Sequence, residues 1–110
     1  MEPEEVVRAL FAGVAGQDLS IVELFAPDAV LDVDDEPRVG HDQIRRFYAG
    51  AFEHAVRPEV EAIFARPPQY AALLRVTTPS GDVRVLDLLE IVDSRIRTLR
   101  VLRPPATPRG

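Results

Sequence analysis

The 110-residue chain contains no cysteine, no lysine and no tryptophan. The absence of cysteine excludes disulfides, thiolate nucleophiles and zinc–sulfur sites. All 13 basic residues are arginines, and 18 acidic residues bring the net charge to −5. Nucleic acids are bound by concentrated stripes of basic side chains, so this balance argues against a nucleic-acid partner. No apolar run approaches the ~20 residues that span a bilayer, and we expect no membrane partner.

The composition is that of a folded globular protein, with 46% hydrophobic and 28% charged residues. We expect a single domain over residues 1–102, followed by a flexible, proline-rich tail over residues 103–110. The first ten residues, MEPEEVVRAL, are acidic and lack the basic start and long apolar stretch of a secretory signal. We therefore expect a cytoplasmic protein.

Three segments in the first half of the chain have helical patterns. Pro3 stands where a helix begins, and apolar residues follow it at helical spacing. Asp18 is placed to cap a second, short helix, which Pro27 is expected to end. A third helix is predicted after Gly40, with one apolar face made by Ile44, Phe47, Tyr48, Ala51 and Phe52.

The second half of the chain has the two-residue period of strands. Residues 29–33 already form a short β-prone run, and after Pro58 the apolar Val60, Ala62 and Phe64 alternate with their neighbours. The segment PSGD is a strong hairpin signal. The order ααβαββββ indicates an α+β fold with three helices packed on a curved, mainly antiparallel sheet. The remaining strands are predicted at 70–78, 83–92 and 95–102.

Four segments, QDLSIVELFAPDAVLDV, EPRVG, IRRFYAG and VLDLLEIVDSRIRTLRVL, resemble the ketosteroid isomerase-like and SnoaL-like proteins of the nuclear transport factor 2-like (NTF2-like) superfamily. The resemblance covers roughly residues 4 to 102. It implies a cone-shaped, cystatin-like fold whose open end leads to an apolar pocket. Function is less constrained, because this superfold hosts isomerases, cyclases, epoxide hydrolases and non-catalytic binding proteins.

Asp87 matches an aspartate that the isomerases of this group keep protonated. In those enzymes it holds the enolate oxygen together with a tyrosine, while a second aspartate moves the proton. The strand face that carries Asp87 is otherwise apolar, so its carboxyl group would be desolvated. Desolvation raises the pKa of a carboxyl group and favours the neutral acid, which can donate a hydrogen bond to an oxyanion. The alternative is a buried aspartate that satisfies a neighbouring donor and meets no substrate.

The position of the base is ambiguous in the stretch AVLDVDDEPRVG. Matching the family pattern forward from Ala29 places the base on Val33, whereas matching it backward from EPRVG brings Asp34 near the pocket. Strand alternation places Val33 on one face and both Asp32 and Asp34 on the other. Either acid would need a bulge or an early turn to reach the pocket. Both Asp32 and Asp34 are kept as candidate catalytic residues beside Asp87.

The family's tyrosine is missing, because its place on the first helix falls on Leu10. Tyr48 matches a tyrosine that supports this donor in some members, and it could offer its hydroxyl to Asp87 or to a ligand; the alternative is a core aromatic. His41 and His54, 13 residues apart on one predicted helix, point to opposite sides and cannot share a metal ion. The candidate substrate-binding residues are Tyr48, Phe11, Phe47, Phe52 and Leu89.

The resemblance and these residues predict an enzyme that uses acid/base chemistry without a cofactor or metal. The expected reaction is an isomerisation by proton transfer, which moves a C=C bond in an apolar ketone or in a polyketide- or steroid-like ligand. Two alternatives stay open: a non-catalytic binding or dimerisation module with the same cone fold, and an epoxide hydrolase or cyclase of the same superfamily. The resemblance also implies a homodimer that forms through the sheet.

Overall fold

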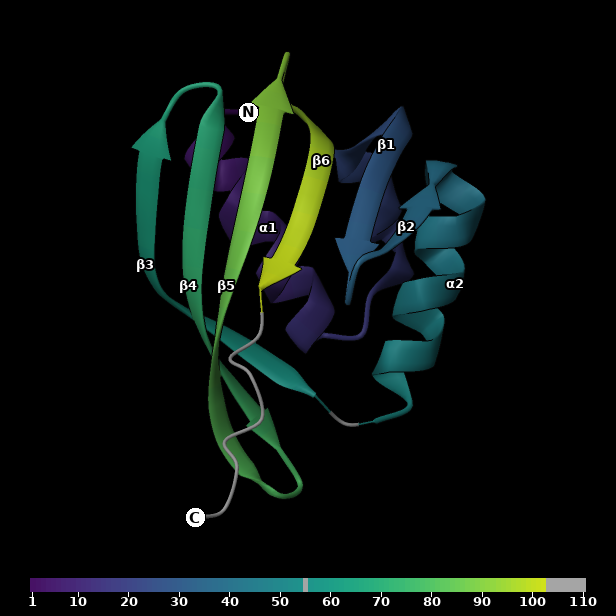
Figure 1. Cartoon of the computed structure of the whole chain (residues 1–110), viewed down its shortest axis with the longest axis vertical. Helices are drawn as coiled ribbons and strands as arrows, with labels where there is room; N and C mark the ends of the chain where they lie inside the picture. Colours follow the sequence, from purple (N-terminus) through teal and green to yellow (C-terminus); the bar gives the residue numbers. More distant parts are fainter. Residues whose placement is uncertain (55, 103–110) are drawn as a thin grey trace.

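The computed structural model describes residues 1–54 and 56–102, so the predicted tail over 103–110 lies outside the described residues. The predicted α+β architecture of helices on a curved, mostly antiparallel sheet is confirmed (Figure 1). The helices are α1 (Pro3–Ala15), the 3₁₀ helix η1 (Leu19–Leu24) and α2 (Gly40–Phe52). The strands are β1 (Phe25–Val33), β2 (Glu36–Val39), β3 (Arg57–Arg66), β4 (Gln69–Thr78), β5 (Gly81–Val92) and β6 (Arg95–Leu102).

The strands form one six-stranded sheet in the order β2-β1-β6-β5-β4-β3. Strands β1 and β6 run parallel, and every other neighbouring pair is antiparallel. In Figure 1, α1 lies behind the strands and α2 lies beside β1 and β2. One face of the sheet therefore packs on the helices, and we call it the inner face; the opposite one is the outer face.

The segment between the first strand and α2 differs from the prediction. Strand β1 begins at Phe25, so Pro27 lies within a strand instead of ending a helix. The pairing of β1 with β6 is irregular between Phe25 and Val30, and a proline without an N–H is tolerated where no ladder bond is needed. The unpredicted strand β2 pairs back on β1 through a turn at Asp34 and Asp35, whose φ angles are 55° and 61°.

A bulge in β3 changes which residues face inward. Val60 pairs with Leu74, but Ala62 pairs with the adjacent Leu73, so one extra residue interrupts the alternation. The predicted alternation therefore holds only as far as the bulge. Beyond it, Phe64 faces outward with 60% of its surface exposed, whereas Ile63 packs against the core.

The core lies between the inner face of the sheet and the helices. Tyr48 is at its centre, with ring centroids at 6.3 Å from Phe25, 5.2 Å from Phe47 and 6.1 Å from Phe52. The predicted cap is also present, because the Asp18 carboxylate accepts a hydrogen bond from the Ser20 amide at 2.9 Å. Among the described residues, no helix has the length and apolar character needed to cross a membrane.

Candidate functional site

Asp87 lies in the middle of a row of residues that crosses the inner face of the sheet. It pairs with Ala72 of β4 and with Val101 of β6. The same register links Ala72 to Ile63 and Val101 to Val33. Residues directly opposite each other share a face, so these five form what we call the inner row. Asp87 is 4% exposed, and it is the only charged residue among the buried ones in the described part of the chain.

Asp87 lines an apolar cavity of about 130 Å³ between the inner face and the two α-helices. Among the described residues that line it, only Asp87 and Tyr48 carry a polar side-chain atom. A carboxyl group and a phenol therefore share a space that otherwise offers hydrocarbon alone. The apolar lining residues are Phe11, Val14, Phe47, Ala51, Phe52, Val56, Pro58, Leu74, Val76, Val85 and Val101.

The environment of Tyr48 keeps its hydroxyl group protonated. Burial raises the pKa of Tyr48 above its ordinary value, and the charge of Asp87 raises this pKa further. A phenol in this state remains a hydrogen-bond donor over the physiological pH range. Its ring is held by Phe25, Phe47 and Phe52, so the direction of the hydroxyl is set by packing.

Most of the predicted substrate-binding residues lie together at this cavity. Phe11, Phe47, Tyr48 and Phe52 all line it beside Asp87. Leu89 does not: it is 1% exposed, lies two residues further along β5 and belongs to the solid core. The prediction grouped it with Asp87 because both share one strand face, but the cavity extends from Asp87 in the opposite direction, toward Val85.

Asp32 and Asp34 do not join Asp87. They line a different hollow with Asp35 and Arg100, which adjoins the cavity at Val101. Strand β1 keeps a regular register with β6 from Val30 to Val33, so no bulge turns Asp32 inward. Asp34 begins the turn to β2. Catalytic roles for Asp32 and Asp34 stay predictions, and they would require a carboxylate to enter the cavity from elsewhere.

Val33 lies on the inner face and is not among the described residues that line the cavity. It is 2% exposed and lies two places from Asp87 in the inner row, with Val101 between them. The forward match of the family pattern had already placed the base position on Val33. A hydrocarbon side chain there cannot accept a proton. Asp87 is the only carboxyl group in the described lining of the cavity.

Sequence reasoning missed the cavity residues supplied by the strands. Val85 could have been found, because it shares the strand face of Asp87 by the two-residue period. Leu74 and Val76 could not, since their position depends on the register between β4 and β5. Within the described residues, no group of three metal-ligating side chains comes together. His41 instead contacts the backbone, with Nε2 2.9 Å from the Phe25 carbonyl oxygen.

Solved structures with the same fold have low sequence identity to this chain. A proposed ketosteroid isomerase from Kribbella flavida gives a TM-score of 0.85 at 19% identity, with 96% of this chain and 80% of that chain covered. The epoxide hydrolase/cyclase-like enzyme SalBIII, from the salinomycin system, gives 0.84 at 20% identity, with 94% and 91% covered. A proposed polyketide cyclase from Sinorhizobium meliloti gives 0.83 at 23% identity, with 88% and 93% covered.

These likenesses show the fold, which other solved structures describe as NTF2-like and as a cystatin fold. No curated protein matches the chain in sequence. The model of the SnoaL-like domain family, by contrast, matches residues 7–99. The chain belongs to the SnoaL-like domain family.

Proposed function

We propose that this protein is an enzyme that isomerises a small apolar carbonyl compound by proton transfer at Asp87. The observation that carries the proposal is the pairing of one buried carboxyl group with one buried phenol in an otherwise apolar cavity. Asp87 is 4% exposed and Tyr48 is 6% exposed, and charges and hydrogen bonds act more strongly at buried positions than in solution. Relatives described as isomerases and cyclases are consistent with this class of chemistry.

In this reaction the Asp87 carboxylate removes a proton from the carbon next to the substrate's carbonyl group. The C–H bond breaks, an O–H bond forms on Asp87, and the electron pair moves onto the carbonyl oxygen. The Tyr48 hydroxyl donates a hydrogen bond to this oxygen. Asp87 then returns the proton to the far carbon of the enolate, and the double bond moves into conjugation. A desolvated carboxylate is a stronger base than one in water, which favours the first step.

An alternative assignment gives the aspartates the roles that the family resemblance implies. Asp87 would stay neutral and hold the enolate oxygen, while Asp32 or Asp34 would take the proton. This assignment needs Asp32 or Asp34 to move from the hollow it lines beside Arg100. We favour Asp87 as the base because the described cavity lining contains no second carboxyl group.

The size of the cavity restricts the substrate. Typical ligand pockets measure about 300–1,000 Å³, and a cavity of about 150 Å³ is large enough for benzene. At about 130 Å³, the cavity holds roughly one ring. A steroid- or polyketide-like compound would therefore place one ring beside Asp87 and leave the rest outside. The same small volume, with a valine at the base position, favours a second candidate: a module that binds an apolar ligand without turnover.

The test uses 3-cyclohexen-1-one and a β,γ-unsaturated ketosteroid, followed by NMR in D₂O. The wild type is expected to form the conjugated ketone, and the hydrogen that Asp87 transfers stays in the product unless it exchanges with D₂O while on the carboxyl group. Asp87→Asn is expected to lower the rate by about 10²–10⁴-fold, the usual contribution of general acid–base catalysis. Tyr48→Phe, which removes one oxyanion donor, is expected to lower it by about 10²–10³-fold.

Asp32→Asn is the matched control, because it neutralises an aspartate outside the cavity and is expected to retain the wild-type rate. A loss in Asp32→Asn equal to that in Asp87→Asn would instead support the alternative roles. Binding of either ketone by the wild type, without conversion to the conjugated ketone, would favour the binding module. Equal rates in Asp87→Asn and the wild type would reject the proposal.

A further inference from the structure

A third hollow, of about 570 Å³, runs along α2 and reaches Arg38. Its polar lining residues are Gln43, Arg46 and His54, with Arg38 from β2. The described residues that line this hollow include no aspartate and no glutamate. In a chain with 18 acidic and 13 basic residues, a groove with two arginines and no acid is an unusual concentration of positive charge. We call it the basic groove.

The two arginines of the basic groove are available to an anion in different ways. Arg46 is exposed and has no ion pair with another described residue, whereas the adjacent Arg45 pairs with Asp42 at 3.3 Å. Arg38 is held in place: its guanidinium lies 4.7 Å from the centre of the Phe47 ring and donates to the Glu36 carbonyl oxygen at 3.0 Å. The Glu36 carboxylate is 3.6 Å from Arg38 and exposed, so solvent weakens this pair.

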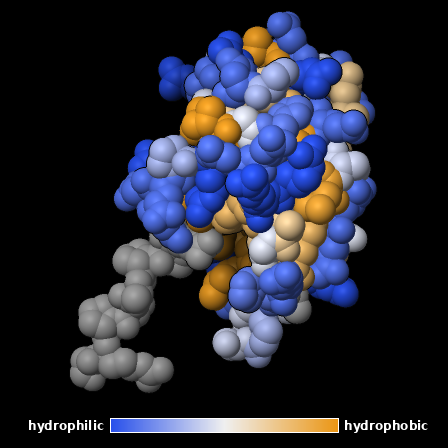
Figure 2. Space-filling view, turned by 90° about the vertical axis from the view of Figure 1, so that its right-hand side faces the viewer, coloured by the Kyte–Doolittle hydropathy of each residue, from blue (hydrophilic) through white to orange (hydrophobic). Residues whose placement is uncertain are grey.

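The basic groove and the cavity that contains Asp87 share part of their lining. Phe47 and Ala51 border both hollows. Figure 2 views the molecule from the side on which α2 lies, and it shows recessed hydrophobic surface close to hydrophilic side chains. The cavity and the basic groove therefore adjoin each other at Phe47 and Ala51.

We propose that the substrate carries an anionic group, a carboxylate or a phosphate, which Arg46 and Arg38 bind in the basic groove while the apolar part lies beside Asp87. Guanidinium groups present paired N–H donors that match the oxygens of both anions. This inference rests on the proposed function, because it extends the same substrate beyond the small cavity. It also accounts for a cavity that holds only one ring.

The test compares three probes with the same phenyl ring: 4-phenylbutanoate, 2-phenylethyl phosphate and the neutral 4-phenylbutanamide. Dissociation constants are measured by calorimetry for the wild type, for Arg46→Gln and for the control Arg45→Gln. Arg46→Gln and Arg45→Gln each remove one positive charge from α2, at adjacent positions. Only Arg46 lines the basic groove. An exposed charge pair is worth little, so we expect one or both anions to bind about 3- to 10-fold more tightly than the amide.

The preference for the anion is expected to disappear in Arg46→Gln and to persist in Arg45→Gln. A preference shown by the carboxylate alone, or by the phosphate alone, identifies the group. Equal affinity of all three probes for the wild type would overturn the inference, although binding of the amide would leave the proposed function standing. Equal losses in both variants would also overturn it, because net charge would then explain the preference. If no probe bound, the inference and the ligand-binding role of the cavity would fall together.

Discussion

The two faces of the sheet bury an aspartate to different degrees: Asp87 on the inner face is buried, whereas Asp32 on the outer face is half-buried. On the inner face, Asp87 pairs with Val101 and is 4% exposed. On the outer face, Asp32 pairs with Arg100, which lies 3.7 Å from the Asp35 carboxylate and remains in contact with solvent. Successive residues of a strand point to opposite faces, so the position along the strand decides whether a carboxyl group is desolvated.

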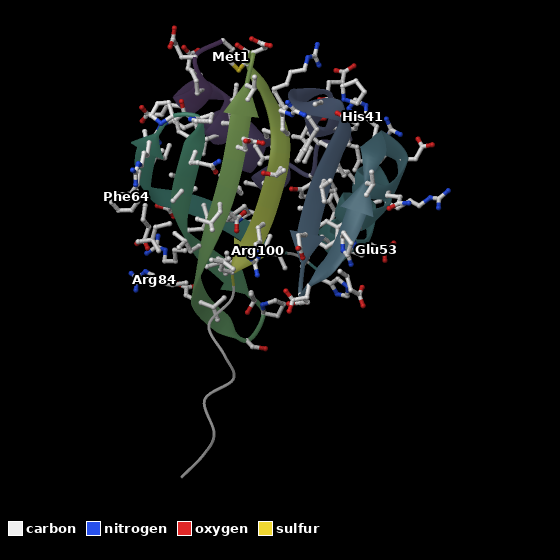
Figure 3. The ribbon with its side chains drawn as sticks, turned by 45° about the horizontal axis from the view of Figure 1, so that its top comes forward. Met1, His41, Glu53, Phe64, Arg84 and Arg100 are labelled. Carbon is white, nitrogen blue, oxygen red and sulfur yellow. The ribbon has the colours of Figure 1, made fainter. Side chains whose placement is uncertain are left out.

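The residues beside Asp32 continue across the whole outer face. Arg100 pairs with Leu88, Leu88 with Ala71, and Ala71 with Phe64. We call these five residues the outer row; it is charged toward β1 and apolar toward β3. Figure 3 shows Phe64 at the β3 edge and Arg100 on the central strand β6. Asp87 and Val101 of the inner row line the apolar cavity, whereas Phe64, at the apolar end of the outer row, is exposed.

The largest change in stability is expected when a carboxylate is added to the inner row. Val33→Asp is expected to lower the free energy of unfolding by about 3–5 kcal/mol, because the new charge would be buried without a partner. Asp32→Val, the matched change on the outer face, is expected to alter it by less than about 1 kcal/mol. Urea unfolding at neutral pH measures both. A cost below 1 kcal/mol for Val33→Asp would show that the inner row admits water.

The second prediction concerns the homodimer through the sheet, which the family resemblance implies. If the apolar end of the outer row forms the contact, Phe64→Asp removes one buried phenyl ring from each copy. Burial of such a side chain is worth about 1.5–3 kcal/mol, so the dimer dissociation constant is expected to rise by at least about 10²-fold. Sedimentation equilibrium measures this change, with Phe64→Leu as the control. A wild type that stays monomeric at its highest soluble concentration would contradict the prediction.

The smallest expected effect is a pH dependence caused by Tyr48. The pKa of Tyr48 is raised in the folded protein, first by burial and then by the charge of Asp87. Below the ordinary pKa of about 10, the Tyr48 hydroxyl is protonated in the folded and in the unfolded chain, so its titration does not lower the free energy of unfolding. Above it, only the unfolded chain releases the proton, so stability falls by up to about 1.4 kcal/mol per pH unit.

Urea unfolding between about pH 9 and pH 11 measures this loss. Tyr48→Phe removes the titrating group, so its stability is expected to fall less steeply than that of the wild type over the same range. Each protein is compared with its own stability at neutral pH, which removes the effect of the substitution on packing. Parallel curves for the two proteins would mean that the folded state releases the Tyr48 proton as readily as the unfolded chain.

Local sequence patterns predict the helices, five of the six strands and the apolar strand face that carries Asp87. These features are local: side-chain period, proline and a capping aspartate specify them within a few residues. The sequence analysis missed β2, because Glu36–Val39 is a short, exposed edge strand that depends on pairing with β1. It also missed the bulge in β3, which leaves Phe64 on the outer face.

The contacts between side chains of the site depend on strand register and helix packing. The regular register between β1 and β6 places Val33 in the inner row and leaves Asp32 on the outer face. The packing of α2 brings Tyr48 to the cavity of Asp87 and places Phe47 between that cavity and the basic groove. Strand register and helix packing join residues far apart in the chain, so no local pattern specifies them.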